Sequence, residues 1–186
     1  MRTILSILTA ALLFASSGAF AVDGYSFEYG KSDSSNSSVN LYRLGMQWDW
    51  NKKLIEYGGW HIGGFWDIDL GYWDNKSPFQ TGGYSTSNIA EIGLTPTFRL
   101  QQNTISGFAP YAELAVGFHF LSHTFVDAQR QFGTSFQFGD HVGAGFRFGD
   151  KGQYDIGYRY QHLSNGSIKG PNQGINYNIV RLQYHF

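Results

Sequence analysis

Apolar and polar residues alternate with a period of two along most of the chain. In residues 42–50, one set of alternate positions is apolar or aromatic and the other is polar or glycine. Successive side chains of a strand point to opposite faces, so this pattern predicts strands rather than helices. Similar runs occupy residues 60–72, 90–100, 108–120, 142–148, 154–161 and 180–186, and a shorter run near 22–30 brings the prediction to eight strands.

The connections between these runs alternate in length. Short turns are predicted at 51–54, 101–104 and 149–152, whereas longer polar connections rich in Gly, Ser and Asn are predicted at 31–38, 73–86, 121–133 and 163–175. Short turns on one side and long loops on the other are typical of outer-membrane barrels, whose turns are periplasmic and whose loops are external.

The residue types on the two faces indicate which face meets lipid. The polar face combines Arg, Asp, Glu and His with Gly, while the apolar face has Trp and Tyr near strand ends, and only Phe65 clearly breaks the alternation. A soluble ligand-binding barrel would bury the apolar face instead. We therefore predict an all-β fold, an eight-stranded antiparallel transmembrane β-barrel, with an interior just wide enough for side chains and no pore.

Composition and the first residues add a cellular location. Arg2, the uncharged apolar run 4–15 and the small-x-small sequence Ala19-Phe20-Ala21 predict a signal peptide over residues 1–21, which leaves a barrel domain at 22–186. The chain has no cysteine, so no disulfide is expected to stabilise it. Its formal net charge is −1 without a basic run, which argues against a nucleic-acid partner.

The segment 161–166 carries the most informative chemistry. His162 and Ser164 are two apart on the seventh predicted strand and share the parity of the lipid-facing residues, next to the long 163–175 connection. An imidazole beside a hydroxyl can act as a general base and raise its nucleophilicity. Two ordinary interfacial polar residues would give the same pair.

A longer set of motifs resembles a known family. These motifs are Tyr42-Arg43-Leu44-Gly45, Trp48-Asp49-Trp50, Trp66-Asp67 with Tyr72-Trp73, Gly143-Ala144-Gly145, and His162-x-Ser164-Asn165 followed by Lys169, Pro171-Asn172 and Gly174-Ile175. Together they resemble the outer-membrane lipid A 3-O-deacylases of the PagL type over essentially the whole chain after the signal peptide.

The resemblance implies a cofactor-free serine esterase that hydrolyses the 3-linked hydroxyacyl ester of lipid A in the bacterial outer membrane. Ser164 would be the nucleophile and His162 the base, and Asn172 with backbone amides near Asn165 and Gly166 would stabilise the oxyanion. Gly166 is equally well explained as a turn residue. The implied partners are lipid A, or lipopolysaccharide, and outer-membrane lipid, with a homodimer left open. The alternative is a non-catalytic barrel with a structural or adhesive role.

One position departs from the family pattern. Where the family has a glutamate at the start of the last strand, this chain has Asn176, which by parity points outward beside His162. An amide oxygen can orient an imidazole but cannot balance the charge of an imidazolium. Asp140 has the same outward parity on the neighbouring strand and is a substitute acid, although a plain polar residue at the rim explains it as well.

The remaining ionisable residues fall on the predicted inner face. We expect His61, His119, His141, Asp67, Asp69, Glu91, Glu113 and Arg147 to fill the interior as an ion-pair network. Charges removed from water need such partners. Their spacing does not match a metal-ligand motif, so no metal site is predicted.

Overall fold

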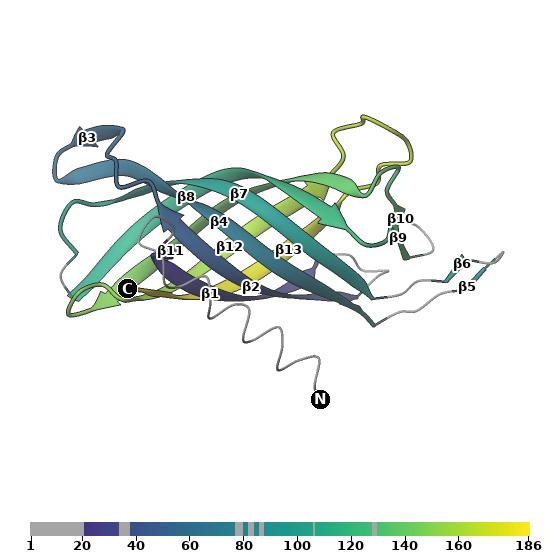
Figure 1. The fold of residues 1–186 in the computed structure, drawn as a ribbon, viewed down its shortest axis with the longest axis horizontal. Helices are drawn as coiled ribbons and strands as arrows, with labels where there is room; N and C mark the ends of the chain where they lie inside the picture. The colour runs from purple at the N-terminus through teal and green to yellow at the C-terminus, as the bar shows by residue number, and fades with distance from the viewer. Residues whose placement is uncertain are drawn as a thin grey trace.

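The computed structural model describes residues 21–33, 38–76, 80–81, 84–85, 88–105, 107–127 and 130–186. The predicted signal peptide thus lies, apart from Ala21, outside the described residues. Eight long antiparallel strands form a closed barrel, as predicted, because β2 pairs with both β1 and β4 (Figure 1). These strands are β1 (Gly24–Ser32), β2 (Val39–Asp49), β4 (Trp60–Asn75), β7 (Ile89–Gln102), β8 (Gly107–Leu121), β11 (Phe136–Gly149), β12 (Tyr154–Ser164) and β13 (Ile175–His185).

Five short strands extend the ends of the barrel. β3 (Ile55–Tyr57) pairs with the start of β4, and two small hairpins are formed by β5 (Gln80–Thr81) with β6 (Tyr84–Ser85) and by β9 (Phe125–Asp127) with β10 (Arg130–Gln131). The long strands also run further than the alternation predicts, since β4 continues to Asn75 and β13 already begins at Ile175. Parts of the predicted 73–86 and 121–133 loops are therefore strands.

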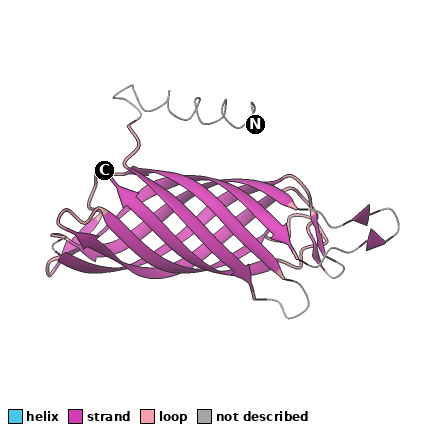
Figure 2. Cartoon of the chain, turned by 90° about the horizontal axis from the view of Figure 1, so that it is seen from below, coloured by secondary structure: helices cyan, strands magenta, loops and turns pink. Residues whose placement is uncertain are grey.

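The barrel has two different ends. Both the start of β1 and the end of β13 lie at the end with the short turns, where the Phe186 amide donates to the Asp23 carbonyl at 2.9 Å (Figures 1 and 2). We call this the turn end. The β5–β6 and β9–β10 hairpins and the residue 165–174 loop lie at the opposite end, which we call the loop end.

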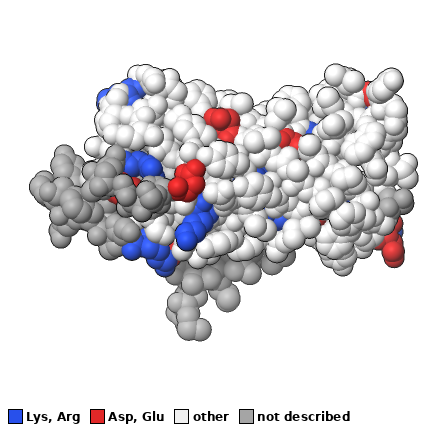
Figure 3. Space-filling view, turned by 180° about the vertical axis from the view of Figure 1, so that it is seen from behind, with Lys and Arg blue, Asp and Glu red and all other residues white. Residues whose placement is uncertain are grey.

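The outward-facing surface of the strands, here called the outer wall, is largely apolar. Most of the surface in Figure 3 carries no charged side chain. Exposed tyrosines occur near both ends, as the interfacial girdles of a membrane barrel require: Tyr25, Tyr154 and Tyr184 at the turn end, and Tyr29, Tyr42, Tyr72 and Tyr160 at the loop end. Within the described residues, none of the structure is a helix that is long and apolar enough to span a membrane.

The middle of the interior is filled by buried ion pairs. Arg43 contacts Glu28, Asp69 and Glu91 at 2.8–3.4 Å, and the other arginines and acids of the lumen extend the same network. Its further members are Asp67, Arg99, Glu113, His119, His141, Asp155, Arg159, Arg181 and His185. The predicted network is confirmed for Asp67, Asp69, Glu91, Glu113, His119 and His141. Phe65, the exception to the alternation, points inward, with the Arg99 guanidinium 4.9 Å from its ring centre.

Two residues predicted for this network have uncharged partners instead. The Nδ1 atom of His61 lies 2.8 Å from the Asn103 side-chain oxygen, and Arg147 donates to the Gly152 carbonyl at 2.9 Å. Both belong to the turn end, where the polypeptide turns supply carbonyl and amide acceptors close to the strand ends. For these two residues, hydrogen bonds to uncharged groups therefore take the place of the predicted ion pairs.

The interior at the loop end is apolar, which the sequence analysis did not predict. Inward side chains of the strand ends pack with the β9–β10 hairpin into a buried cluster: Val39, Leu41, Trp73, Ile89, Leu121, Val126, Phe132, Leu163, Ile175, Tyr177 and Ile179. We call it the apolar plug. It fills the barrel directly behind the loop-end residues of β12 and β13. It therefore supports the side chains that these residues present on the outer wall.

Candidate active site

His162 and Ser164 are the last two residues of β12 that face the outer wall, and they lie at its loop end. Both side chains are half-buried, whereas their neighbours Leu163 and Asn165 are fully buried on the inner side. The predicted shared face is therefore observed. β12 lies between β11 and β13, so the pair has one strand on either side of it.

Asn176 on β13 is the register partner of His162. Its side-chain oxygen lies 2.6 Å from the Nδ1 atom of His162. Asn176 thus lies where an orienting group for the imidazole is needed, with its oxygen toward the ring. The other ring nitrogen, Nε2, faces away from this contact, as general-base chemistry at a neighbouring hydroxyl would require.

Asp140 is the register partner of His162 on the opposite side, on β11. Its side chain is exposed, and the hydrogen bond that the structure gives the imidazole goes to Asn176 rather than to Asp140. The structure therefore brings Asp140 beside His162 without using it to orient the ring.

The loop after β12 is folded on itself by the two asparagines that the sequence analysis singled out. The backbone amide of Asn165 donates to the side-chain oxygen of Asn172 at 2.9 Å, and the Asn165 side chain donates to the Lys169 carbonyl at 2.6 Å. Asn165 is completely buried. Its side chain therefore serves to hold the loop, and its backbone amide is engaged by Asn172.

Two glycines of this loop have conformations that favour glycine. Gly166 and Gly174 have φ angles of 61° and 65°. A Cβ atom on Gly174 would lie 2.7 Å from the His162 ring, so this glycine allows the imidazole to pack directly on the backbone. Gly166 similarly faces the Phe138 ring, at 3.2 Å from its ideal Cβ position.

The β9–β10 hairpin supports the loop from the side. Phe132 forms an isolated antiparallel bridge with Asn172, and the Gln131 backbone amide donates to the Gln173 side chain at 3.1 Å. Because Phe132 is buried in the apolar plug, the hairpin connects the position of Asn172 to the packing inside the barrel.

Asp33 is a neighbour of the candidate site that was not predicted from the sequence. It is the first residue after β1, and one carboxylate oxygen accepts hydrogen bonds from the Asn176 side-chain nitrogen at 3.3 Å and from the Tyr160 hydroxyl at 2.8 Å. The pairing of β1 with β13 brings residues this distant in the chain together. The alternation of polar and apolar residues carries no information about such a contact.

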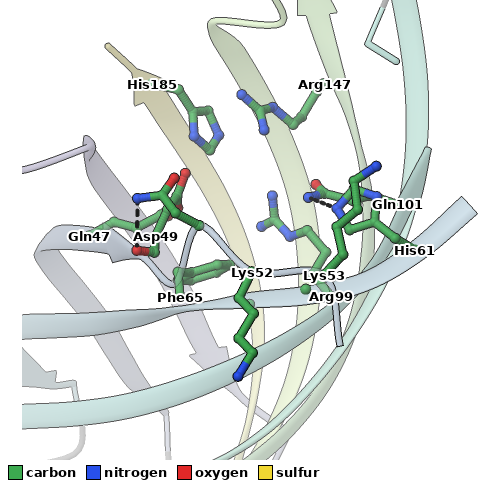
Figure 4. A pocket seen from close by; sticks show the side chains of 13 residues that line it. Gln47, Asp49, Lys52, Lys53, His61, Phe65, Arg99, Gln101, Arg147 and His185 are labelled. Carbon is green, nitrogen blue, oxygen red and sulfur yellow. Dashed lines mark hydrogen bonds between the residues drawn. The ribbon is translucent and has the colours of Figure 1, made fainter. Parts of the chain in front are cut away.

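A cavity of about 290 Å³ lies at the turn end, away from His162. Arg99, Arg147, His61 and His185 point into it (Figure 4). In the middle of the interior, Asp69, Glu91 and His119 have ligand-type atoms within 4.8 Å of one another. Arg43 contacts both of these carboxylates, so a cationic side chain already lies against the cluster.

The fold and the placement of these side chains first define the class of protein. It is a small integral β-barrel of the outer membrane, with a histidine and a serine on its outer wall. The comparisons then give the family. The family model described as Lipid A 3-O-deacylase (PagL) matches residues 40–185, and the chain belongs to this family.

Individual relatives agree with this assignment. The chain is similar to the lipid A deacylase PagL of Pseudomonas aeruginosa, at 33% identity over 72% of this chain and 71% of the relative. It is also similar to the lipid A deacylase PagL of Bordetella bronchiseptica, at 29% identity over 100% of this chain and 95% of the relative.

Two solved structures share the fold. The crystal structure of the outer membrane enzyme PagL aligns with a TM-score of 0.73 and 26% identity, covering 88% of this chain and 99% of that one. Neisserial surface protein A (NspA) aligns with a TM-score of 0.51 and 14% identity, over 88% of this chain and 95% of the other, which indicates a common fold alone.

Proposed function

We propose that the protein is a lipid A 3-O-deacylase that hydrolyses the ester-linked hydroxyacyl chain at position 3, with Ser164 as nucleophile and His162 as general base. The observation that carries the proposal is the 2.6 Å contact between His162 Nδ1 and Asn176 Oδ1 on the outer wall. Ser164 follows His162 by two residues and faces the same side of β12. In a member of the PagL family, this is an oriented imidazole beside a hydroxyl.

The reaction proceeds in two balanced halves. Nε2 of His162 takes the hydroxyl proton as Ser164 Oγ attacks the ester carbonyl carbon, and the tetrahedral intermediate expels the sugar oxygen, which receives that proton from His162. Water then attacks the acyl-serine ester, gives its proton to His162, and the acid departs as the proton returns to Ser164. Each half thus needs one neutral imidazole that first accepts and then donates a proton.

Oxyanion stabilisation needs hydrogen-bond donors aimed at the developing negative charge. The Asn165 amide donates to Asn172 Oδ1, and this contact turns the Nδ2 group of Asn172 away from Asn165. We therefore assign the oxyanion to Asn172 Nδ2 and to the backbone amide of Gly166. The role of Asn165 is then to fix Asn172 and the loop.

The location of the site suits a substrate that is itself part of the membrane. The loop end is external by the usual orientation of such barrels, and the site lies just below it on the outer wall. A lipid ester of the outer leaflet reaches Ser164 sideways, without leaving the bilayer. We also propose, on their sequence pattern, that residues 1–21 are a signal peptide that is removed on export.

Mass spectrometry of lipid A from outer membranes that carry the protein tests this function. The unmutated protein should remove one hydroxyacyl chain, whereas Ser164→Ala and His162→Ala should remove none. Ser135→Ala and His123→Ala are matched controls, since these exposed residues lie in the connection between β8 and β11. Deacylation by both site variants, or none by the folded unmutated protein, would refute the proposed function.

A further inference from the structure

The imidazole of His162 is linked to a carboxylate through an amide. Nδ1 of His162 contacts Asn176 Oδ1 at 2.6 Å, and Asn176 Nδ2 donates to Asp33 Oδ2 at 3.3 Å. The same Asp33 oxygen accepts the Tyr160 hydroxyl at 2.8 Å. The carboxylate of Asp33 thus does not contact the imidazole directly. It is separated from His162 by one side chain, that of Asn176.

The backbone holds Asp33 in place. Its amide donates to the Asn176 carbonyl at 3.2 Å, which continues the β1–β13 pairing one residue beyond the last registered pair, Ser32 with Tyr177. Together with the Tyr160 contact, this bond fixes both the main chain and the carboxylate of Asp33. Asp33 is therefore positioned by two strands, β12 and β13, although it follows β1.

The order of these contacts determines the direction of the Asn176 amide and the tautomer of His162. A carboxylate accepts hydrogen bonds only, so the Asn176 side chain must turn its NH₂ group toward Asp33. This leaves Oδ1 toward His162, and an oxygen acceptor requires a proton on Nδ1. The neutral ring then has its lone pair on Nε2, which is the form that can accept a proton from a serine hydroxyl.

Without Asp33 the amide would have no fixed direction. With its NH₂ group toward the ring, Asn176 would donate to Nδ1 and favour the tautomer protonated on Nε2. That tautomer cannot take the proton of Ser164. A wrong tautomer is a severe defect in serine hydrolases when an amide replaces the acid of the triad.

Resting on the deacylase function proposed above, we infer that Asp33 is a positioning residue: it fixes the direction of the Asn176 amide and, through it, the tautomer of His162 in which Nε2 is the base. Asp33 also supplies the negative charge that Asn176 lacks. Once His162 is protonated during the reaction, the carboxylate acts on it through the polarised amide rather than by direct contact.

The first test reads the tautomer directly. Nitrogen-15 NMR of the folded full chain in detergent micelles, at a pH where the ring is neutral, should show His162 protonated on Nδ1, with the signal assigned by its loss in His162→Gln. Asp33→Ala should shift the ring toward the tautomer protonated on Nε2. The control Asp74→Ala, which removes a loop-end aspartate paired with Lys76, should leave it unchanged. An unchanged ring in Asp33→Ala, or the same shift in Asp140→Ala, overturns the inference.

The second test separates positioning from a merely structural role. Asp33→Ala should lower kcat about tenfold or more at nearly constant KM, since a hydrogen bond to a charged group is lost. In an Asn176→Glu background a carboxylate contacts His162 directly, so Asp33→Ala should no longer lower kcat. An equal loss in both backgrounds would mean that Asp33 only supports the fold, and would overturn the inference.

The two tests also distinguish the failure of this inference from the failure of the proposed function. If the unmutated barrel removes no acyl chain from lipid A, the deacylase function fails, but the NMR comparison still decides whether Asp33 sets the tautomer of His162. If deacylation proceeds and the tautomer does not respond to Asp33→Ala, the function stands and the role of Asp33 is refuted.

Discussion

At the scale of single residues, His162 depends on a neighbour that has no side chain. Gly174 combines a φ angle of 65° with a backbone surface on which the imidazole packs. Any Cβ atom there would lie 2.7 Å from the ring and would have to displace it. The ring is thus held between Gly174, against whose backbone it packs, and the Asn176 side chain, to which it is hydrogen-bonded.

We expect Gly174→Ala to reduce deacylation at least tenfold while the barrel still folds, because the new Cβ atom must displace the ring and a φ angle of 65° strains alanine. Quantitative mass spectrometry of lipid A and the gel mobility of the folded barrel measure the two effects. Gly170→Ala is the control in the same loop, since no atom beyond the adjoining residues lies within 4 Å of its ideal Cβ position. Full activity of Gly174→Ala would show that the position of the ring tolerates this displacement.

Candidate site residues could be placed from the sequence where their positions depend on one strand or one register, but not where they depend on the closing of the barrel. The parity of His162, Ser164 and Asn176 is sufficient to place all three on the outer wall. Asp33 is different, because it follows β1 and reaches Asn176 only through the pairing of the first strand with the last. No local pattern predicts such a contact.

At the scale of elements, the β9–β10 hairpin is the part of the structure that couples the site to the interior. Phe132 is 1% exposed, packs in the apolar plug and pairs with Asn172 in the loop after β12. Residues 121–133 are predicted from the sequence to be a connecting loop. The short strands there lack a long alternating run, so only tertiary packing shows their role.

Phe132→Ala should remove roughly 3–5 kcal/mol of local packing and loosen the residue 165–174 loop. We expect deacylation to fall severalfold and tryptic cleavage after the exposed Lys169 to accelerate, with the barrel strands intact. Phe108→Ala, on the outer wall at the turn end, is the control and should change neither. Unaltered cleavage after Lys169 would argue that the hairpin does not hold the loop.

At the scale of the whole molecule, the barrel has a charged middle and an apolar plug. Glu28 contacts three arginines, Arg43, Arg159 and Arg181, at 2.6–3.2 Å, and all four side chains are at most 5% exposed. Sequence alternation correctly placed the charged residues inside. It could not reveal which acid pairs with which arginine, because these contacts depend on the strand register and on the closing of the barrel. Glu28 lies opposite Arg43 of β2 and opposite Arg181 of β13, whereas Arg159 is on β12, two strands away.

Glu28→Ala should therefore destabilise the barrel by roughly 3–5 kcal/mol, since it leaves buried guanidinium groups without a partner. Glu56→Ala, which removes an exposed pair with Lys53, should cost less than about 1 kcal/mol. Urea unfolding in lipid vesicles compares the free energies of unfolding. Similar stabilities of the two variants would contradict the view that the ionic interior holds the barrel together.

The placement of His162 and Ser164 on the outer wall also has a consequence for how substrate reaches the proposed site. Encounters occur by diffusion within the plane of a membrane, so the relevant concentration is molecules of substrate per unit of surface. In mixed micelles, the proposed reaction should slow as inert detergent dilutes lipid A at the micelle surface, even when its bulk concentration is constant. The rate should recover when the surface fraction is restored, which identifies the bilayer itself as the reaction medium.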